Sequence, residues 1–221
     1  MTLLARLDRF NQRHPWSHND FYGRWVLGRV RSARAREVLD IGCGTGNLID
    51  RLRPDVERVT GVEPDPDSAR AAADRFAGDA AVVIEQLRFD QLPPRRWDAI
   101  TLVASLHHLP LHESIPVLDR SLNPGGRLIV IGCYRASSLL DHFVGGVAAL
   151  ANPLLGLLKH PRVAERLPHA MTAPTAPPRE TLTDIRAAAR AHLPGARIRR
   201  RLFWRYSLVY DKPGRLPTPP G

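Results

Sequence analysis

Alternating glycines in the stretch 37–48 constrain the fold of this chain more than any other feature of its sequence. Apolar residues predict a short buried strand over 37–41, and helix-compatible residues follow from 48 to 52. Three glycines lie between the two: Gly42, Gly44 and Gly46. Glycine adopts backbone conformations that other residues avoid, and it lets a ligand approach the main chain closely. The pattern therefore predicts a strand, a ligand-binding turn and a helix.

The spacing of these glycines differs from the pattern that binds dinucleotides. That pattern, G-x-G-x-x-G, presents bare amides and a helix N-terminus to a pyrophosphate. Here the sequence reads D-x-G-x-G-x-G, with Asp40 at the end of the predicted strand. A carboxylate at this position repels a phosphate and attracts a cation. The loop therefore predicts a ligand that carries positive charge.

Three further motifs follow the loop in order along the chain. They are Gly61-Val62-Glu63-Pro64, Trp97–Val103 leading into Ser105-Leu106-His107-His108, and Asn123-Pro124-Gly125-Gly126 before an apolar run at 128–131. The four motifs together, over residues 37–132, resemble those of the class I S-adenosylmethionine-dependent methyltransferases of the small-molecule type. The resemblance implies a Rossmann-like, doubly wound α/β sheet of seven strands, mostly parallel, with one antiparallel strand from a C-terminal hairpin.

The resemblance also implies S-adenosylmethionine as the cofactor, because its sulfonium and α-ammonium suit the carboxylate of Asp40. Glu63 lies where the family has an acid that accepts hydrogen bonds from two ribose hydroxyls. Asp90 resembles the family's adenine-contacting acid. The residues expected to bind the cofactor are then Asp40, Gly42, Cys43, Gly44, Gly46, Glu63, Pro64 and Asp90.

His107 and His108 are the candidate catalytic residues. Methyl transfer from a sulfonium needs an aligned nucleophile and exclusion of water, and it needs a base only when the acceptor must lose a proton. A histidine beyond the predicted strand 99–103 can take that proton, since its ordinary pKa lies near neutral pH. In the alternative interpretation one histidine packs or caps a helix and the other is solvated.

Aromatic residues near the N-terminus form a second candidate cluster. Trp16, Phe21 and Tyr22 lie beside His14 and His18 in a chain with only 6% aromatic residues. Such rings can cover a sulfonium through their π faces and act as a lid over the substrate. Equally, they can simply attach the N-terminal segment to the core.

The net charge of +10 raises the possibility of nucleic acid binding. Lysine occurs only at Lys159 and Lys212, so 32 basic residues less 2 leaves 30 arginines, a bias typical of GC-rich coding sequence. The arginines cluster only at 197–201, where alternation predicts a hairpin with a solvated polar side. An RNA-binding face is the alternative there.

Cys43 and Cys133 predict two free thiols, and no Cys/His spacing predicts a metal site.

Periodicity and turn residues predict the remaining organisation. Residues 1–36 are expected to form a helical preface or lid, interrupted at 14–22, and residues 37–133 the cofactor-binding core. Residues 134–180 form a substrate-side insert, 181–211 a helix and hairpin of the same domain, and 212–221 a tail. The predicted strands are 37–41, 59–62, 81–85, 99–103, 128–131, 196–203 and 206–211, and the helices end near 52 or span 68–76, 113–122 and 181–192. Thr181 to Asp184 predicts a capping box at the start of the last helix, and Pro124-Gly125-Gly126 predicts a turn before the strand 128–131.

The apolar run 143–158 is too short and too broken for a membrane span, which needs about 20 apolar residues. It predicts buried helices over the active site, or an interfacial segment that makes peripheral membrane contact. The first ten residues are too charged for a signal peptide, so the sequence predicts a cytoplasmic protein.

Together these features predict methyl transfer to a small, hydrophobic acceptor. Three alternatives remain: an RNA methyltransferase that uses the basic C-terminal face, a cofactor-binding module without turnover, and a nicotinamide oxidoreductase, which the glycine spacing disfavours. The sequence identifies neither the methylated atom nor the oligomeric state.

Overall fold

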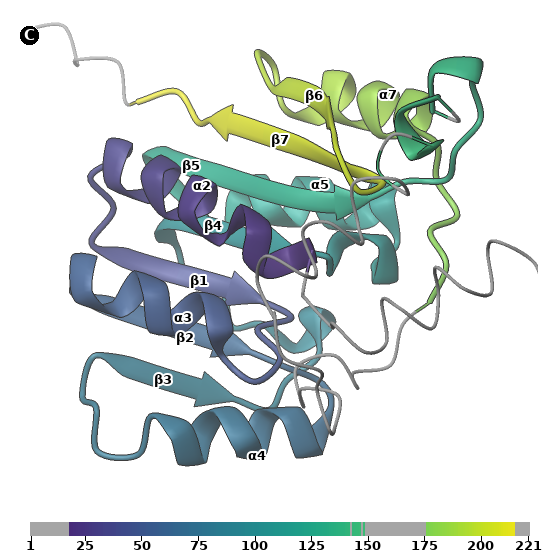
Figure 1. Cartoon of the computed structure of the whole chain (residues 1–221). Helices are drawn as coiled ribbons and strands as arrows, with labels where there is room; N and C mark the ends of the chain where they lie inside the picture. The colour runs from purple at the N-terminus through teal and green to yellow at the C-terminus, as the bar shows by residue number, and fades with distance from the viewer. Residues whose placement is uncertain (1–17, 142, 147, 149–175, 215–221) are drawn as a thin grey trace, which may run out of the picture.

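Seven strands form one mixed sheet in the part of the chain that the computed structural model describes, residues 18–141, 143–146, 148 and 176–214. Their order is β3-β2-β1-β4-β5-β7-β6, and β7 alone runs antiparallel (Figure 1). The strands are β1 (Glu37–Ile41), β2 (Arg58–Val62), β3 (Val82–Glu85), β4 (Trp97–Val103), β5 (Leu122–Cys133), β6 (Arg197–Arg201) and β7 (Arg205–Asp211). The predicted fold is confirmed, including the antiparallel hairpin strand between β5 and β6.

The order of the strands creates a crevice between β1 and β4. The chain runs outward from β1 to β3 and then returns to the other side of β1, so the connections after β1 and β4 diverge. In a doubly wound sheet, ligands bind beyond the carboxyl ends of the strands at this switch point. The glycine loop follows β1 directly and therefore lies at that edge, on the right in Figure 1.

Helices cover both faces of the sheet (Figure 1). The α-helices of the described residues are α2 (His18–Ser32), α3 (Asn47–Leu52), α4 (Pro66–Arg75), α5 (Leu111–Arg120) and α7 (Leu182–His192). Short 3₁₀ turns are η1 (Arg53–Asp55), η2 (Phe89–Gln91) and η3 (Leu106–His108). The helices α5 and α7 pack on one face, and α2 and α3 on the other.

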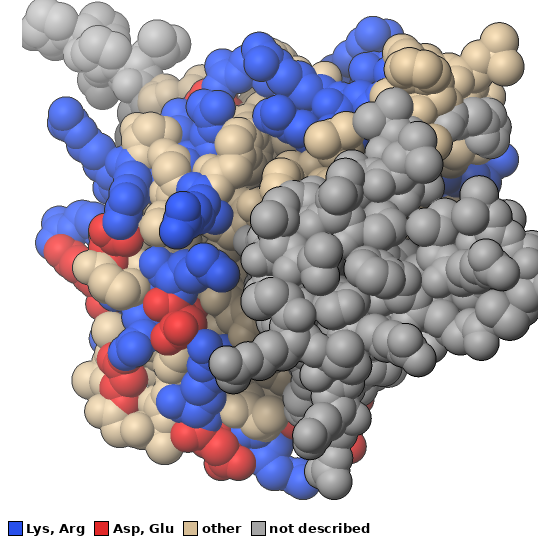
Figure 2. All heavy atoms as spheres, viewed as in Figure 1, with Lys and Arg blue, Asp and Glu red and all other residues tan. Residues whose placement is uncertain are grey.

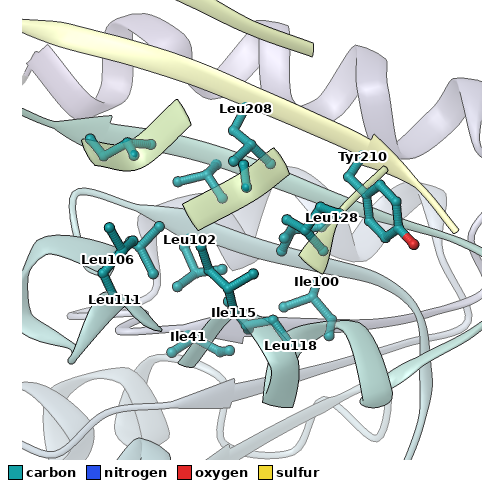
Figure 3. Packing of buried hydrophobic residues seen from close by; sticks show 14 of the residues in the cluster. Ile41, Ile100, Leu102, Leu106, Leu111, Ile115, Leu118, Leu128, Leu208 and Tyr210 are labelled. Atoms are coloured by element: carbon teal, nitrogen blue, oxygen red, sulfur yellow. The ribbon is translucent and has the colours of Figure 1, made fainter. Parts of the chain in front are cut away.

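Alternation along β1 explains how one short strand serves both cores. Leu39 and Ile41 point into the cluster under α5 and α7, whereas Val38 points into the cluster under α2 and α3. Figure 3 shows the first cluster, where Ile115 and Leu118 of α5 meet the central strands. Strands buried on both faces read as nearly continuous apolar runs, which is why the sequence predicted them well.

The strand β5 begins earlier than the sequence predicted. A turn was expected at Pro124-Gly125-Gly126 and a strand only from 128, but β5 already pairs with β4 at Leu122. The register shifts between Trp97 and Ala99, so the Pro-Gly-Gly run forms a bulge inside the strand. Gly125 adopts a φ of 80°, and a Cβ at Gly126 would lie 2.9 Å from the Asn123 carbonyl oxygen. Both glycines are therefore needed for the bulge.

The helix α2 corrects a second expectation. The predicted interruption at 14–22 is wrong for its last residues, because α2 starts at His18 and includes Phe21 and Tyr22. Tyr22, Val26 and Val30 recur every four residues and bury one side of the helix against the sheet. Residues 1–17 and 149–175 lie outside the described residues, so the division into preface, core and insert stays a prediction.

The described helices contain no segment long and apolar enough to cross a membrane. The same part of the chain brings no three His, Cys, Asp or Glu side chains together in a way that would hold a metal ion.

The start of α7 provides a test of the predicted capping box. Thr181 Oγ1 accepts from the Asp184 amide at 3.2 Å, and Asp184 accepts from the Thr181 amide at 2.8 Å. We expect Thr181→Ala to lower the free energy of unfolding by about 1 kcal/mol. Thr183→Ala removes the same atoms from an exposed position in the first turn, two residues after the N-cap, and should leave stability unchanged or slightly higher. Equal losses in urea denaturation of the two variants would contradict the capping role.

Candidate functional site

The glycine loop is held against β2 and the segment after β4. The amides of Gly42 and Cys43 both donate to the Val62 carbonyl, at 2.8 and 3.2 Å. Gly42 has a φ of 70°, and a Cβ there would lie 2.6 Å from the Cβ of Ser105. Ser105 Oγ in turn donates to the Ile41 carbonyl at 2.6 Å. The loop is thus wedged where β1 and β4 diverge.

The three glycines differ in what surrounds them. Gly46 has a φ of 81°, and a Cβ there would clash with the Phe76 ring, so this glycine permits packing of α4 against the loop. Gly44 also has a positive φ, 54°, but no atom of the described residues lies within 4 Å of a Cβ built there. The backbone at Gly44 therefore faces open space that a ligand can occupy.

Glu63 ties the loop to the end of β2. Its Oε2 accepts from the Gly44 amide at 2.8 Å, and its Oε1 accepts from the Asp65 amide at 3.0 Å. Asp65 caps α4 by accepting from the Ser68 amide at 2.9 Å. Glu63 is only 8% exposed, so these amides offset part of the penalty for burying its charge. One carboxylate thereby fixes the loop and the entry to α4 together.

Asp40 is a buried carboxyl at the end of β1, with 2% of its surface exposed. Thr101 of β4 donates to its Oδ1 at 2.7 Å. Burial raises the pKa of Asp40 to about 7; the hydrogen bond from Thr101 opposes this shift, and the charge of Glu63 adds to it. Within the described residues, no Lys, Arg or His side chain forms an ion pair with Asp40. A cation in this place would satisfy the carboxylate.

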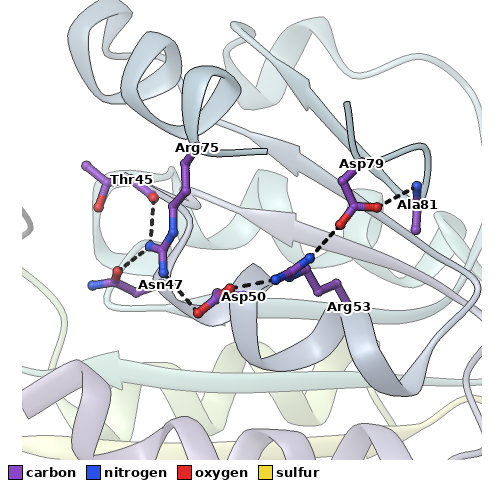
Figure 4. Close-up of polar contacts among 7 residues, drawn as sticks. All are labelled: Thr45, Asn47, Asp50, Arg53, Arg75, Asp79 and Ala81. Atoms are coloured by element: carbon purple, nitrogen blue, oxygen red, sulfur yellow. Dashed lines mark hydrogen bonds and ion pairs between the residues drawn. The ribbon is translucent and has the colours of Figure 1, made fainter. Parts of the chain in front are cut away.

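Two arginines, Arg53 and Arg75, bind the glycine loop and α3 through partly exposed polar contacts (Figure 4). Arg75, at the end of α4, donates to Asn47 Oδ1 at 2.8 Å and forms an ion pair with Asp50 at 3.0 Å. Arg53 bridges Asp50 to Asp79, the latter at 2.7 Å. Such partly exposed pairs are individually weak, but the network joins α3, α4 and the turn before β3. It therefore helps to fix the position at which α3 begins.

The two histidines lie in η3, directly after β4, with 4.1 Å between their ring centroids. His107 is half-buried, and its Nδ1 is fully buried without a hydrogen-bond partner among the residues that the structure describes. Burial lowers its pKa to about 4, the charges of His108 and Arg205 add to the shift, and the backbone of Ala176 opposes it. His107 is therefore neutral at pH 7. Its pKa lies well below the ordinary histidine value on which the sequence-based prediction relied. His108 is exposed.

The predicted lid is described only in part, because Trp16 and His14 and the side chain of His18 lie outside the described residues. Tyr22 donates to the Leu202 carbonyl at 2.9 Å, and the Phe21 ring packs edge-on against Phe203 at 5.4 Å. These contacts attach the start of α2 to the β6–β7 turn. They agree with the second interpretation, in which the aromatic residues dock the N-terminal segment.

The remaining predicted residues lie around the same edge of the sheet. Pro64 follows Glu63, and Cys43 is a buried free thiol whose pKa is raised by burial. Asp90 lies in η2 after β3, where it is exposed and pairs with Arg88 at 3.2 Å. Asp98, by contrast, lies at the opposite end of β4 and accepts from the backbone amides of Arg36 and Glu37 at the start of β1.

Sequence reasoning missed Thr101 and Ser105. Thr101 was inside a predicted strand, and its partnership with Asp40 depends on β4 lying next to β1. A polar residue at a buried strand position was the only local signal. Ser105 follows Ala104, whose φ of 57° is unusual for a residue with a Cβ and has no signal in the sequence.

The raised pKa of Asp40 predicts a defined dependence of stability on pH. Between its ordinary value of 3.8 and about 7 the folded protein retains a proton that the unfolded chain releases. The stability from Asp40 is therefore complete below about pH 4 and lost as the pH rises through 7. We expect Asp40→Asn to gain stability over the wild type, by on the order of 2 kcal/mol, between pH 5 and pH 8.

Urea denaturation at both pH values measures this difference, and Asp67→Asn, at an exposed carboxyl of α4, is the matched control. A difference between Asp40→Asn and the wild type that stays constant with pH would show that Asp40 is ionised in the folded protein throughout this range.

Comparison with known proteins identifies the family. A family model described as a methyltransferase domain matches residues 39–128. An uncharacterized methyltransferase of Mycobacterium bovis is 33% identical over 208 residues, which cover 90% of this chain and 98% of that protein. A counterpart in Mycobacterium tuberculosis has the same identity and coverage.

Solved structures share the fold. The methyltransferase domain of bacterial CtHen1 is 18% identical with a TM-score of 0.60, covering 93% of this chain and all of that one. Magnesium protoporphyrin IX methyltransferase from Synechocystis, solved with bound SAH, is 17% identical with a TM-score of 0.55 and covers 96% of this chain and 88% of that one. The chain belongs to the class I S-adenosylmethionine-dependent methyltransferases, with S-adenosylmethionine as its cofactor.

Proposed function

We propose that this protein transfers a methyl group to a small, hydrophobic acceptor at the carboxyl edge of its sheet. The observation that carries the proposal is the buried carboxyl of Asp40 next to the open backbone at Gly44. A low-polarity site that holds a negative charge without a basic partner favours a cationic ligand. The donor fits this requirement through its sulfonium and α-ammonium.

The residues of the loop have distinct roles in holding the donor. Asp40 opposes its positive charge, and Gly44 leaves room for it beside the main chain. Glu63 accepts two amide hydrogens, and a carboxylate offers about four acceptor sites, so two remain for ribose hydroxyls. The remaining proposed cofactor-binding residues shape the loop or extend it toward the adenine: Gly42, Cys43, Gly46, Pro64 and Asp90.

Bound S-adenosylmethionine supplies an electrophilic methyl group on a sulfonium. What this chain adds is position and exclusion of water, because an in-line displacement gains most of its rate from alignment. The half-buried ring of His107 lies beside this edge, and its Nδ1, which is buried and has no hydrogen-bond partner among the described residues, is the proposed proton acceptor. A neutral imidazole of low pKa accepts a proton only weakly, so it suits an acceptor whose proton is already acidic. His108 is the exposed second candidate.

Burial near η3 supports an apolar acceptor. Burial is the largest cause of the lowered pKa of His107 and of the raised pKa of the Cys133 thiol at the end of β5. Both shifts indicate low polarity on the side of the edge away from Glu63. A highly charged acceptor would lose hydration there without gaining an equivalent partner.

An RNA acceptor is the alternative, and the ion pairs of the hairpin count against it. Arg197 pairs with Asp211 at 2.8 Å, and Arg200 pairs with the buried Asp141 at 2.8 Å. These two guanidinium groups already have carboxylate partners and are less available to phosphates. A third possibility is a module that binds the cofactor without turnover.

Gly44→Ala tests the proposed cofactor site. The added methyl enters the open space at Gly44, so we expect the affinity for S-adenosylmethionine in calorimetry to fall at least roughly tenfold. The positive φ adds a stability loss of about 1 kcal/mol. Gly78→Ala is the matched control, because Gly78 also has a positive φ and open surroundings but lies beyond α4. Wild-type affinity in Gly44→Ala would contradict the site.

The acceptor is found by incubating the protein with labelled methyl donor and an extract that contains both metabolites and RNA. We expect the label in a small compound that partitions into organic solvent, and a lower kcat in His107→Gln with donor affinity unchanged. Label in nuclease-sensitive material would favour the RNA alternative. Donor binding without any transfer would favour the module without turnover.

A further inference from the structure

The large hydrophobic side chains that are exposed in the described residues all come from three short segments. These are the start of α2, the helical stretch that follows β5, and the β6–β7 turn: Phe21, Leu139, Leu140, Phe143, Leu202 and Trp204. We refer to these six residues as the apolar patch. Leu139 is 90% exposed and Phe143 69%. Single exposed hydrophobic residues are ordinary, whereas a contiguous group marks an interaction surface.

Direct contacts bring the three segments together. The Phe21 ring packs against Phe203 in the β6–β7 turn, with 5.4 Å between centroids. A Cβ at Gly145 would lie 2.8 Å from the indole nitrogen of Trp204, so the helical stretch runs directly against the same turn. The three segments that carry the patch therefore lie side by side, although they are far apart in the sequence.

A buried ion pair fixes the helical stretch in this position. Asp141 is 3% exposed and accepts from Arg200 of β6 at 2.9 Å. It also accepts from the amides of Ser137 and Ser138, at 3.0 and 2.9 Å. With its polar group satisfied inward, this stretch presents Leu139, Leu140 and Phe143 outward.

The chain beside the patch is strongly basic. Between Asp184 and Asp211 the sequence has seven arginines and no acidic residue. Figure 2 shows Lys and Arg side chains along the upper edge of the molecule, over β6. In the described part of the chain, no carboxylate pairs with Arg199, Arg201 or Arg205. Exposed apolar side chains and positive charge thus lie next to one another.

From this juxtaposition we infer that the apolar patch docks the protein on a membrane surface rich in anionic lipid. Apolar side chains enter the boundary between headgroups and acyl chains, while nearby arginines stay at the level of the anionic headgroups. Trp204 suits this boundary because its ring is apolar and its indole N–H is polar. The inference rests on the surface alone and does not require methyl transfer.

The composition of the patch distinguishes a membrane from other partners. Leu139, Leu140 and Leu202 are aliphatic, and aliphatic side chains insert among acyl chains but do not stack on nucleic acid bases as aromatic rings do. In self-association through the patch, the unpaired arginines of two copies would approach one another, and that repulsion opposes a dimer. An anionic bilayer matches both the apolar and the charged part.

The test is co-sedimentation of the full chain with lipid vesicles. One set consists of phosphatidylcholine alone, and in the other roughly a third of the lipid is phosphatidylglycerol. We expect binding to the anionic vesicles that weakens with salt, and little binding to the neutral ones. The double substitution Leu139→Ser with Phe143→Ser keeps the net charge and should weaken binding at least roughly tenfold. Circular dichroism verifies that the variant is folded.

Matched charge variants test the arginine contribution. Arg199→Gln should weaken binding to anionic vesicles about fivefold, whereas Arg70→Gln, with the same charge change on α4, should not alter it. Equal binding to both vesicle types, or full binding by the double variant, overturns the inference. So does RNA binding without vesicle binding, or a dimer that dissociates on the same substitutions and does not sediment with vesicles.

Discussion

The buried carboxyl of Asp40 is the constraint around which the proposed cofactor site is built. Asp40 is the last residue but one of β1, and Thr101 of the adjacent strand β4 donates a hydrogen bond to its carboxylate. No Lys, Arg or His side chain in the described residues forms an ion pair with Asp40, so a bound cation would stabilise its negative charge. The glycine loop, Glu63 and the cap of α4 then arrange backbone and carboxylate groups around that point.

Much of the fold was predictable because its signals are local. The strand β1 spans the predicted residues, and α7 follows its predicted capping box, since each depends on apolar spacing or on a cap within a few residues. The bulge in β5 was missed because a Pro-Gly-Gly run is equally typical of a turn, and only the pairing of Leu122 with Trp97 distinguishes the two. The pairing between β4 and β5 therefore determines whether the Pro-Gly-Gly run forms a turn or a bulge.

The candidate site also has features that local sequence indicates and features that depend on distant residues. The sequence predicted Asp40, Gly44 and Glu63 as cofactor-binding residues, because the resemblance to the family depends on their spacing, and that role stays a prediction. The low pKa of His107 was not predictable, because it comes mainly from burial in the folded protein; His108 and then Arg205, which is 98 positions away, add to it. Acceptor chemistry depends on such long-range neighbours, and so the sequence leaves it less defined than the cofactor site.

The late position of β7 in the chain affects how the protein is made. Residues 127–133 of β5 pair with residues 205–211 of β7, so β5 lacks its second neighbour until the last strand has been synthesised. Contacts between such distant segments form slowly because a long loop must close first. A growing chain would meanwhile present the apolar edge of β5, with Leu128 and Val130, to other chains. An incomplete chain therefore exposes a strand edge that the folded protein pairs, and such edges favour aggregation.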